Sequence, residues 1–408
     1  MNSNKRLSPK TEKVNKKRVD IKADLIIKIA FYVLVAAYGA LCLYLFYKQS
    51  VQGLNPDNHY FESDLPYHIS MVVDDGWYYS LTAFIYLALY KITGGSAVLI
   101  AIFLALVAAA TVVATKKLMD KIFPGEEVIN YGAALALNLV MPFFVKWAGM
   151  YRYVSYQSGN VWHNSTYICM RLAAVIFLCF FADYEKNYSE RGLNVKEWII
   201  LTVLLALTTF IKPSFLTVFA PALAIKLLWD LIKNKIKFVR ALIMGLIVIP
   251  SMGVMLWQNS VLFGSDTENG FKFSFMETFS LHADHPKITV ILSLAFPLVV
   301  FVCDLVVKGK FWKDKAYVFS LIMTAIGFAE AILLVETGSR SRDGNFLWGY
   351  SLSMFVLYLM SFKRWYGFMK NKKWIAGGIS GAVFAYQLVC GAVFFTRLMA
   401  GETYFMIG

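Results

Sequence analysis

Long apolar runs separated by short polar connections occupy the chain from residue 25 to near its C-terminus. Most runs hold about 20 residues, and a helix of that length crosses roughly 30 Å of hydrocarbon. Because lipid offers the backbone no hydrogen-bond partners, such runs must form helices. The pattern predicts an all-α, polytopic helical membrane protein with about eleven transmembrane helices, at residues 25–47, 96–115, 128–147, 167–183, 198–211, 214–231, 241–260, 288–306, 317–336, 346–361 and 375–396.

Composition agrees with this pattern and excludes a soluble globular protein. Hydrophobic residues make up 58% of the chain and charged residues 16%, against roughly 25% charged in an average soluble domain. No connection between the runs is long enough to fold as a sizeable soluble domain. We therefore predict a basic tail at 1–24 and a single integral-membrane domain at 25–408.

The net charge of +14 is explained by membrane orientation, without any nucleic-acid partner. Most Lys and Arg fall in the tail and in the connections near 116–127, 184–197, 232–240, 307–316 and 362–374. The positive-inside rule places these segments in the cytoplasm. We expect a plasma-membrane protein with a cytoplasmic N-terminus and an extracytoplasmic C-terminus.

The segment Ser80–Thr93 is apolar enough to be mistaken for another span. If it crossed the bilayer, every later basic connection would move outside, against the positive-inside rule. Aromatic residues such as Trp77, Tyr78 and Tyr86 suit the outer headgroup layer. We expect a flat juxtamembrane helix here, although the alternative of a span stays open.

Polar chemistry gathers in the connections that this layout places outside. All five histidines fall there, and the first outer loop, 48–95, is the longest. It contains Glu62-Ser63-Asp64, and an extended chain would send both carboxylates to one face. Such a pair suits proton transfer or a divalent cation, and solvated loop acids are the alternative.

Taken together, these features resemble the GT-C superfamily of integral-membrane glycosyltransferases. Those enzymes carry an acidic motif in the first outer loop, followed by a juxtamembrane helix and a series of further spans. Glu62-Ser63-Asp64 matches the Glu-x-Asp type of this motif, and Asp74-Asp75 matches the Asp-Asp type. The prolines usual at the start of the juxtamembrane helix are missing here.

The resemblance implies transfer of a sugar from a polyprenyl-phosphate carrier to a glycan, lipid or protein acceptor, with inversion at the anomeric carbon. Asp64 is then the expected catalytic base. Glu62 would orient Asp64, raise its pKa, or share a divalent cation such as Mg²⁺ or Mn²⁺ with it. The single sequence leaves these roles open, and an inactive accessory member of the superfamily would look alike.

Substrate-binding candidates lie in several outer segments. Lys212, at the turn between two spans, would bind the carrier phosphate or snorkel to the interface. Arg340 and Arg342 would also bind the carrier phosphate, or they would anchor their loop to nearby acids. The remaining candidates, polar groups that suit sugar hydroxyls or neighbour the acidic motif, are His68, Asp74, Asp75, Arg152, Gln157, Asn160, His163 and Asn164. An interfacial aromatic belt explains the tyrosines and tryptophans around 151–162 equally well.

Two other classes of function stay open at this point. A secondary transporter or lipid-linked sugar flippase would use charges at membrane depth, such as Glu330, Asp304 and Lys212. A lipid-linked glycan polymerase or ligase would use arginines of two outer loops. His282-Ala283-Asp284-His285 offers metal ligands in a third segment, with a solvated loop as the alternative.

Overall fold

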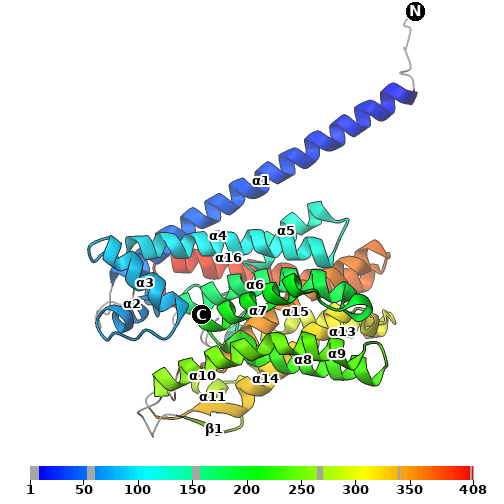
Figure 1. The fold of residues 1–408 in the computed structure, drawn as a ribbon. Coiled ribbons are helices and arrows are strands. Elements are labelled where there is room, and N and C mark those ends of the chain that lie inside the picture. The colour runs from blue at the N-terminus through cyan, green and yellow to red at the C-terminus, as the bar shows by residue number, and fades with distance from the viewer. Residues whose placement is uncertain are drawn as a thin grey trace, which may run out of the picture.

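The computed structural model describes residues 9–52, 60–148, 157–263, 270–338, 341, 343–404 and 407. Almost all regular structure is helical (Figure 1). The helices are α1 (Pro9–Gln52), α2 (Leu65–Val73), α3 (Leu81–Ile92), α4 (Val98–Ile122), α5 (Glu127–Leu137), α6 (Ser165–Arg191), α7 (Val195–Ile211), α8 (Ser214–Ile232), α9 (Phe238–Gly245), α10 (Ile249–Phe263), α11 (Glu277–His282), α12 (Pro286–Ser293), α13 (Ala295–Val306), α14 (Lys315–Leu333), α15 (Leu347–Lys370) and α16 (Trp374–Met399).

Single 3-10 turns and one small sheet complete the fold. The turns are η1 (Lys146–Ala148), η2 (Leu246–Val248) and η3 (Phe311–Lys313). The sheet pairs β1 (Phe271–Phe273) antiparallel with β2 (Leu334–Glu336). Sequence patterning predicted no strands, because three residues are too few to show a period-two alternation.

The apolar helices make this a multi-pass helical membrane protein. Within the described residues, seven helices are long and apolar enough to cross a bilayer, or eight if the bent pair α12–α13 forms one span. The seven match the predicted spans that begin at residues 25, 96, 167, 214, 241, 317 and 375. The expected total of about eleven is not confirmed by this count.

The predicted spans 128–147, 198–211 and 346–361 are not among these helices, each for its own reason. Helix α7 has 17 residues, and α15 has 24 but carries polar and basic side chains. The prediction of one span over 128–147 is wrong as a continuous helix, since α5 ends at Leu137. Residues 138–145, which include Pro142, are not helical, and proline has no backbone N–H to continue a helix.

Helix α3 occupies the segment whose role was ambiguous. Ser80 caps it by accepting a hydrogen bond from the Ala83 N–H at 3.2 Å. Its 12 residues rise about 18 Å, short of the roughly 30 Å of a hydrocarbon core. A single crossing by α3 alone is therefore excluded by length, while its placement in the headgroup layer remains a prediction.

Helix α15 lies at the centre of the bundle. Every residue from Leu347 to Phe362 is buried, and α15 packs against α8, α13, α14 and α16. Glycine allows the closest approach, because a Cβ on Gly327 of α14 would lie only 2.8 Å from Cα of Tyr350. Small residues at such crossings increase van der Waals contact between membrane helices.

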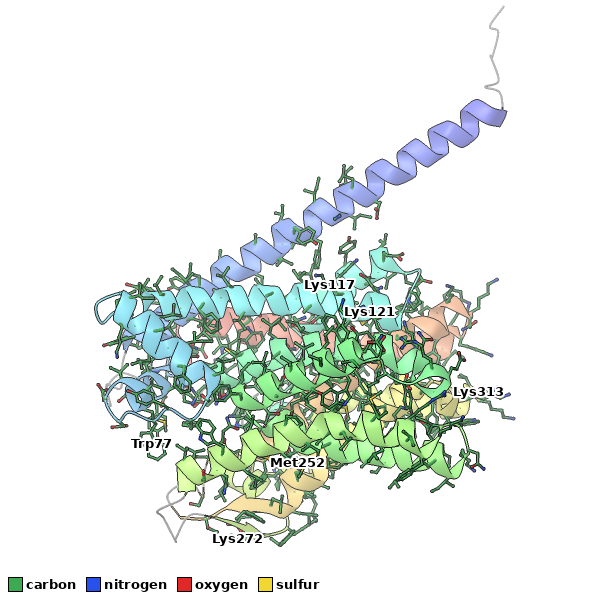
Figure 2. The ribbon with its side chains drawn as sticks, in the orientation of Figure 1. Trp77, Lys117, Lys121, Met252, Lys272 and Lys313 are labelled. Carbon is green, nitrogen blue, oxygen red and sulfur yellow. The ribbon has the colours of Figure 1, made fainter. Side chains whose placement is uncertain are left out.

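The two ends of the bundle differ in chemistry (Figure 2). We call one the basic end: it joins residues 116–127, 183–197, 230–240, 304–315 and 363–373 through ion pairs and hydrogen bonds. We call the other the loop end; it holds residues 60–80, 157–164, 334–338 and 401–404. In Figure 2, Trp77 and Lys272 mark the loop end and Lys313 the basic end.

Candidate functional site

Asp64 lies at the loop end, immediately before α2. Its backbone N–H donates to the carbonyl of His163 at 3.2 Å. Its carboxylate accepts a hydrogen bond from Asn164 Nδ2 at 2.7 Å and one from the Tyr404 hydroxyl at 3.3 Å. Three segments far apart in the chain therefore meet at one partly exposed carboxylate.

Asn164 is oriented by its role at the start of α6. Its Oδ1 accepts hydrogen bonds from the Tyr167 N–H at 2.9 Å and from Thr166 Oγ1 at 2.9 Å. An asparagine before the first helical residue commonly caps the free N–H groups in this way. Because the capping oxygen is fixed, the amide nitrogen points to Asp64.

Lys212 joins the same group from the turn between α7 and α8. Its Nζ donates to Thr166 Oγ1 at 3.2 Å and lies 5.1 Å from the ring centre of Trp348. A cation over an indole face is stabilised by the ring quadrupole. Asp64, Asn164, Thr166 and Lys212 thus form a continuous hydrogen-bonded chain with a carboxylate at one end and an ammonium group at the other.

His163 and Tyr404 form the wall of this site. Their rings stack with centroids 3.8 Å apart, and the imidazole is only 6% exposed. Burial, together with the positive charge of Lys212, lowers the pKa of His163 to about 3. The imidazole is therefore neutral at physiological pH. His68 lies on α2 nearby, with Nδ1 2.9 Å from Ser165 Oγ.

The two acidic motifs are separated by α2. Asp64 precedes this nine-residue helix, and Asp74 and Asp75 follow it in exposed positions, roughly 14 Å away by helical rise. Glu62 is exposed as well, and Asp64 adopts helical angles (φ −72°, ψ −10°). The expectation of an extended stretch that aligns Glu62 with Asp64 is therefore wrong at Asp64.

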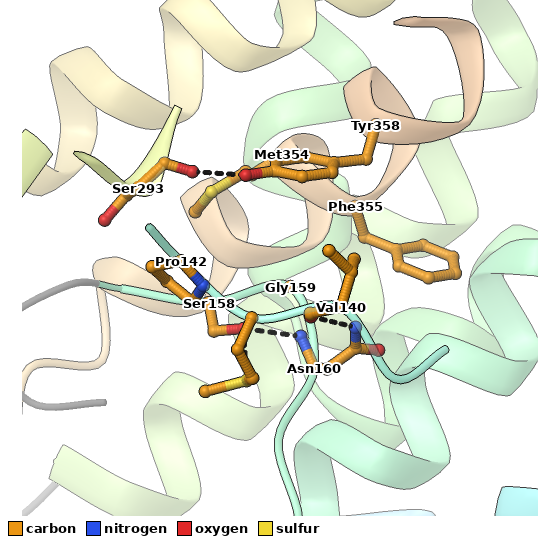
Figure 3. A pocket seen from close by; sticks show the side chains of 10 residues that line it. Val140, Pro142, Ser158, Gly159, Asn160, Ser293, Met354, Phe355 and Tyr358 are labelled. Carbon is orange, nitrogen blue, oxygen red and sulfur yellow. Dashed lines mark hydrogen bonds between the residues drawn. The ribbon is translucent and has the colours of Figure 1, made fainter. Parts of the chain in front are cut away.

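Asn160 has a structural role, contrary to the prediction that it binds a sugar. It is 1% exposed, and its Nδ2 donates to the carbonyls of Leu137 and Val140 at 2.9 and 2.7 Å. Its Oδ1 accepts from Arg171 at 2.6 Å. Figure 3 shows Asn160 among the residues that line a small pocket, across from Tyr358 and Ser293. Gln157 is likewise buried.

Some predicted residues lie outside the part of the chain that the structure describes. These are Arg152, Arg340 and Arg342. The side chain of His282 lies outside it too, so the proposed ligand group at 282–285 is not described in full. Within the described residues, no three His, Cys, Asp or Glu side chains gather to hold a metal ion. The expected divalent cation has no such ligand set there.

Sequence reasoning missed Tyr404, Thr166 and Trp348. Tyr404 follows helix α16. The only hint in the sequence was that an aromatic side chain stands on the predicted outer side. Thr166 and Trp348 begin long helices and look like ordinary span residues. Only folding shows that they contact His163, Asn164 and Lys212. Neither a protein-family model nor a curated protein matches the sequence.

Proposed function

We propose that this protein is a GT-C-like membrane glycosyltransferase that moves a sugar from a polyprenyl-phosphate carrier to an acceptor, with inversion. The observation that carries the proposal is the chain from Asp64 through Asn164 and Thr166 to Lys212. It holds a carboxylate and an ammonium group at one end of a helical membrane bundle, which supports roles for them as proton acceptor and phosphate-binding cation.

The chemistry divides between these two groups. Asp64 takes the proton of the acceptor hydroxyl as the acceptor oxygen attacks the anomeric carbon. The bond from that carbon to the phosphate oxygen breaks, and the polyprenyl phosphate leaves with the bonding electron pair. Lys212 stabilises the negative charge that develops on the phosphate.

Topology forms part of the same proposal. The loop end faces the outside of a plasma membrane, where the donor headgroup and a glycan, lipid or protein acceptor meet. The N-terminus is cytoplasmic, the C-terminus is extracytoplasmic, and the chain crosses the bilayer about eleven times. Tyr404 then closes the site from the outer side of the last helix.

A transfer assay on purified protein tests this function. Wild type is compared with Asp64→Asn and with Asp74→Asn, a matched change on the same loop, using a panel of polyprenyl-phosphate sugars and membrane-extract acceptors. Loss of the general base is expected to lower kcat by about 10²- to 10⁴-fold in Asp64→Asn alone. Equal activity in all three proteins would exclude the proposed base.

A second pair of variants tests the phosphate site. Lys212→Met is expected to weaken donor binding and slow transfer, whereas Lys91→Met, an exposed lysine on α3, should change neither. Donor binding without turnover in wild type would indicate an accessory protein. Movement of labelled donor across vesicles without transfer would favour the flippase alternative.

A further inference from the structure

An apolar hollow opens at the basic end, away from the candidate active site. It lies between α4, α6, α8, α14 and α15, has a volume of about 200 Å³ and is partly open to the surroundings. Its walls are mainly hydrocarbon and aromatic, contributed by Leu118, Ile122, Leu178, Phe181, Phe319 and Met360. Such a surface suits an alkyl or prenyl chain better than a polar solute.

Four lysines line this hollow, and two of them pair with carboxylates. Lys121 pairs with Asp183, and Lys226 pairs with Glu185 at 3.0 Å and Asp230 at 2.8 Å. Lys315, by contrast, is exposed, and no carboxylate within the described residues pairs with it. Lys186 is exposed too, and it donates to the Lys121 carbonyl at 3.4 Å with no described carboxylate partner. Uncompensated positive charge therefore borders the opening.

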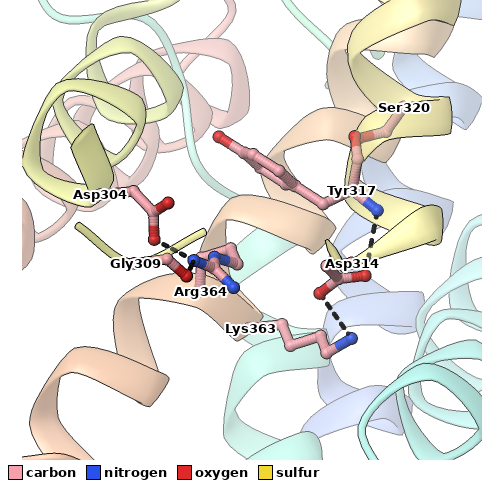
Figure 4. A network of polar contacts seen from close by, with 7 residues as sticks. All are labelled: Asp304, Gly309, Asp314, Tyr317, Ser320, Lys363 and Arg364. Atoms are coloured by element: carbon pink, nitrogen blue, oxygen red, sulfur yellow. Dashed lines mark hydrogen bonds and ion pairs between the residues drawn. The ribbon is translucent and has the colours of Figure 1, made fainter. Parts of the chain in front are cut away.

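A second, shallow hollow, largely open to the surroundings, adjoins the first at Lys315 and Ala316, which line both. It holds Lys310 and Lys313, two further exposed lysines that no described carboxylate pairs with. The other cations there are neutralised, as Figure 4 shows: Lys363 pairs with Asp314 at 2.8 Å and Arg364 with Asp304. Three exposed lysines without described carboxylate partners thus line the surface that adjoins the apolar hollow.

We propose that the two hollows together bind one anionic lipid. Its hydrocarbon chain lies against Phe181, Phe319 and Met360, and its phosphate meets Lys310, Lys313 and Lys315. Basic pockets between membrane helices attract phosphate-bearing headgroups, and the attraction acts within a Debye length of the surface. This site is independent of the proposed transfer reaction, which uses the opposite end of the bundle.

Lipid binding to the purified full-length protein, measured by native mass spectrometry, tests this proposal. Phosphatidylglycerol and phosphatidylcholine of equal chain length are the probes. The triple variant Lys310→Ala/Lys313→Ala/Lys315→Ala is expected to lose phosphatidylglycerol affinity by roughly a hundredfold. The matched control Lys117→Ala/Lys196→Ala/Lys237→Ala removes three exposed lysines of the same end and should bind nearly as wild type does.

A chain-blocking variant separates lipid from free phosphate. Ala182→Leu adds volume to the apolar hollow, which Ala182 lines, and leaves the lysines in place. It should weaken phosphatidylglycerol binding. Inorganic phosphate, added as a competitor, should displace the remaining lipid only weakly and to the same extent in this variant and in wild type. Thermal unfolding checks that each variant is folded. Equal binding of both lipids by wild type, or unchanged phosphatidylglycerol binding in the triple and chain-blocking variants, would overturn the proposal.

Discussion

Asn164 donates a hydrogen bond to Asp64 over 2.7 Å, although 100 positions separate the two residues in sequence. The contact fixes the carboxylate against the first turn of α6. It also couples Asp64 to Lys212, because Thr166 bonds to both Asn164 and Lys212. The candidate base is therefore held by a helix cap.

Substitution of Asn164 separates its two roles. Asn164→Ser keeps a capping oxygen but cannot reach Asp64, whereas Asn164→Ala loses both contacts. We expect transfer to fall about 10- to 100-fold in each variant, since a hydrogen bond to a charged group contributes about 1.5–3 kcal/mol. Loss of the cap should cost about 1 kcal/mol of stability in Asn164→Ala only. Kinetics and thermal unfolding measure the two effects, and a drop in activity that follows stability alone would contradict a positioning role.

Acid should destabilise the protein through His163. Its folded-state pKa of about 3 lies below the usual 6.5, so the unfolded state binds more protons between these values. The contribution of the neutral His163 imidazole to the free energy of unfolding is complete above about pH 6.5 and is lost as the pH drops toward 3. Thermal unfolding across this range should show a shallower decline in His163→Gln than in wild type. Parallel curves for the two proteins would mean that other groups dominate the acid response.

Gly391 sets the distance between α16 and the non-helical chain after α5. A Cβ at this position would collide with the carbonyl oxygen of Leu139, whereas a Cβ on Gly378 of the same helix meets nothing within 4 Å. Gly391→Ala should therefore lower stability by about 1–3 kcal/mol. Gly378→Ala should be neutral or stabilising by up to about 1 kcal/mol. Denaturation in detergent measures both, and equal stabilities would argue against this close contact.

The buried ion pair at the basic end should matter more than its exposed neighbours. Asp304 is 1% exposed, pairs with Arg364 and accepts a hydrogen bond from the Phe311 N–H at 3.0 Å. Asp304→Ala leaves the guanidinium uncompensated, which typically costs about 3–5 kcal/mol. Asp183→Ala breaks the more exposed pair with Lys121 and should cost under about 1 kcal/mol. A small loss in both variants would show that water compensates Arg364.

The candidate site was only partly predictable from the chain. Asp64, Asn164, His163 and Lys212 were each singled out by residue type and by position at the ends of apolar runs. Their mutual contacts were not, because sequence gives no distance between loops a hundred residues apart. Asn160 shows the converse case: an amide that looked available for a sugar is used up by two carbonyls and Arg171.

By itself the sequence determined that most of the chain lies in a lipid bilayer and that its fold is helical. In lipid, runs of about 20 apolar residues can satisfy their backbone hydrogen bonds only as helices. It also determined which connections are basic, because charge is local information. Tertiary structure alone decided that α5 stops at Leu137, that Asp74 is held away from Asp64 by α2, and that Tyr404 returns to stack on His163. These features depend on packing between distant segments, which no local pattern of residues encodes.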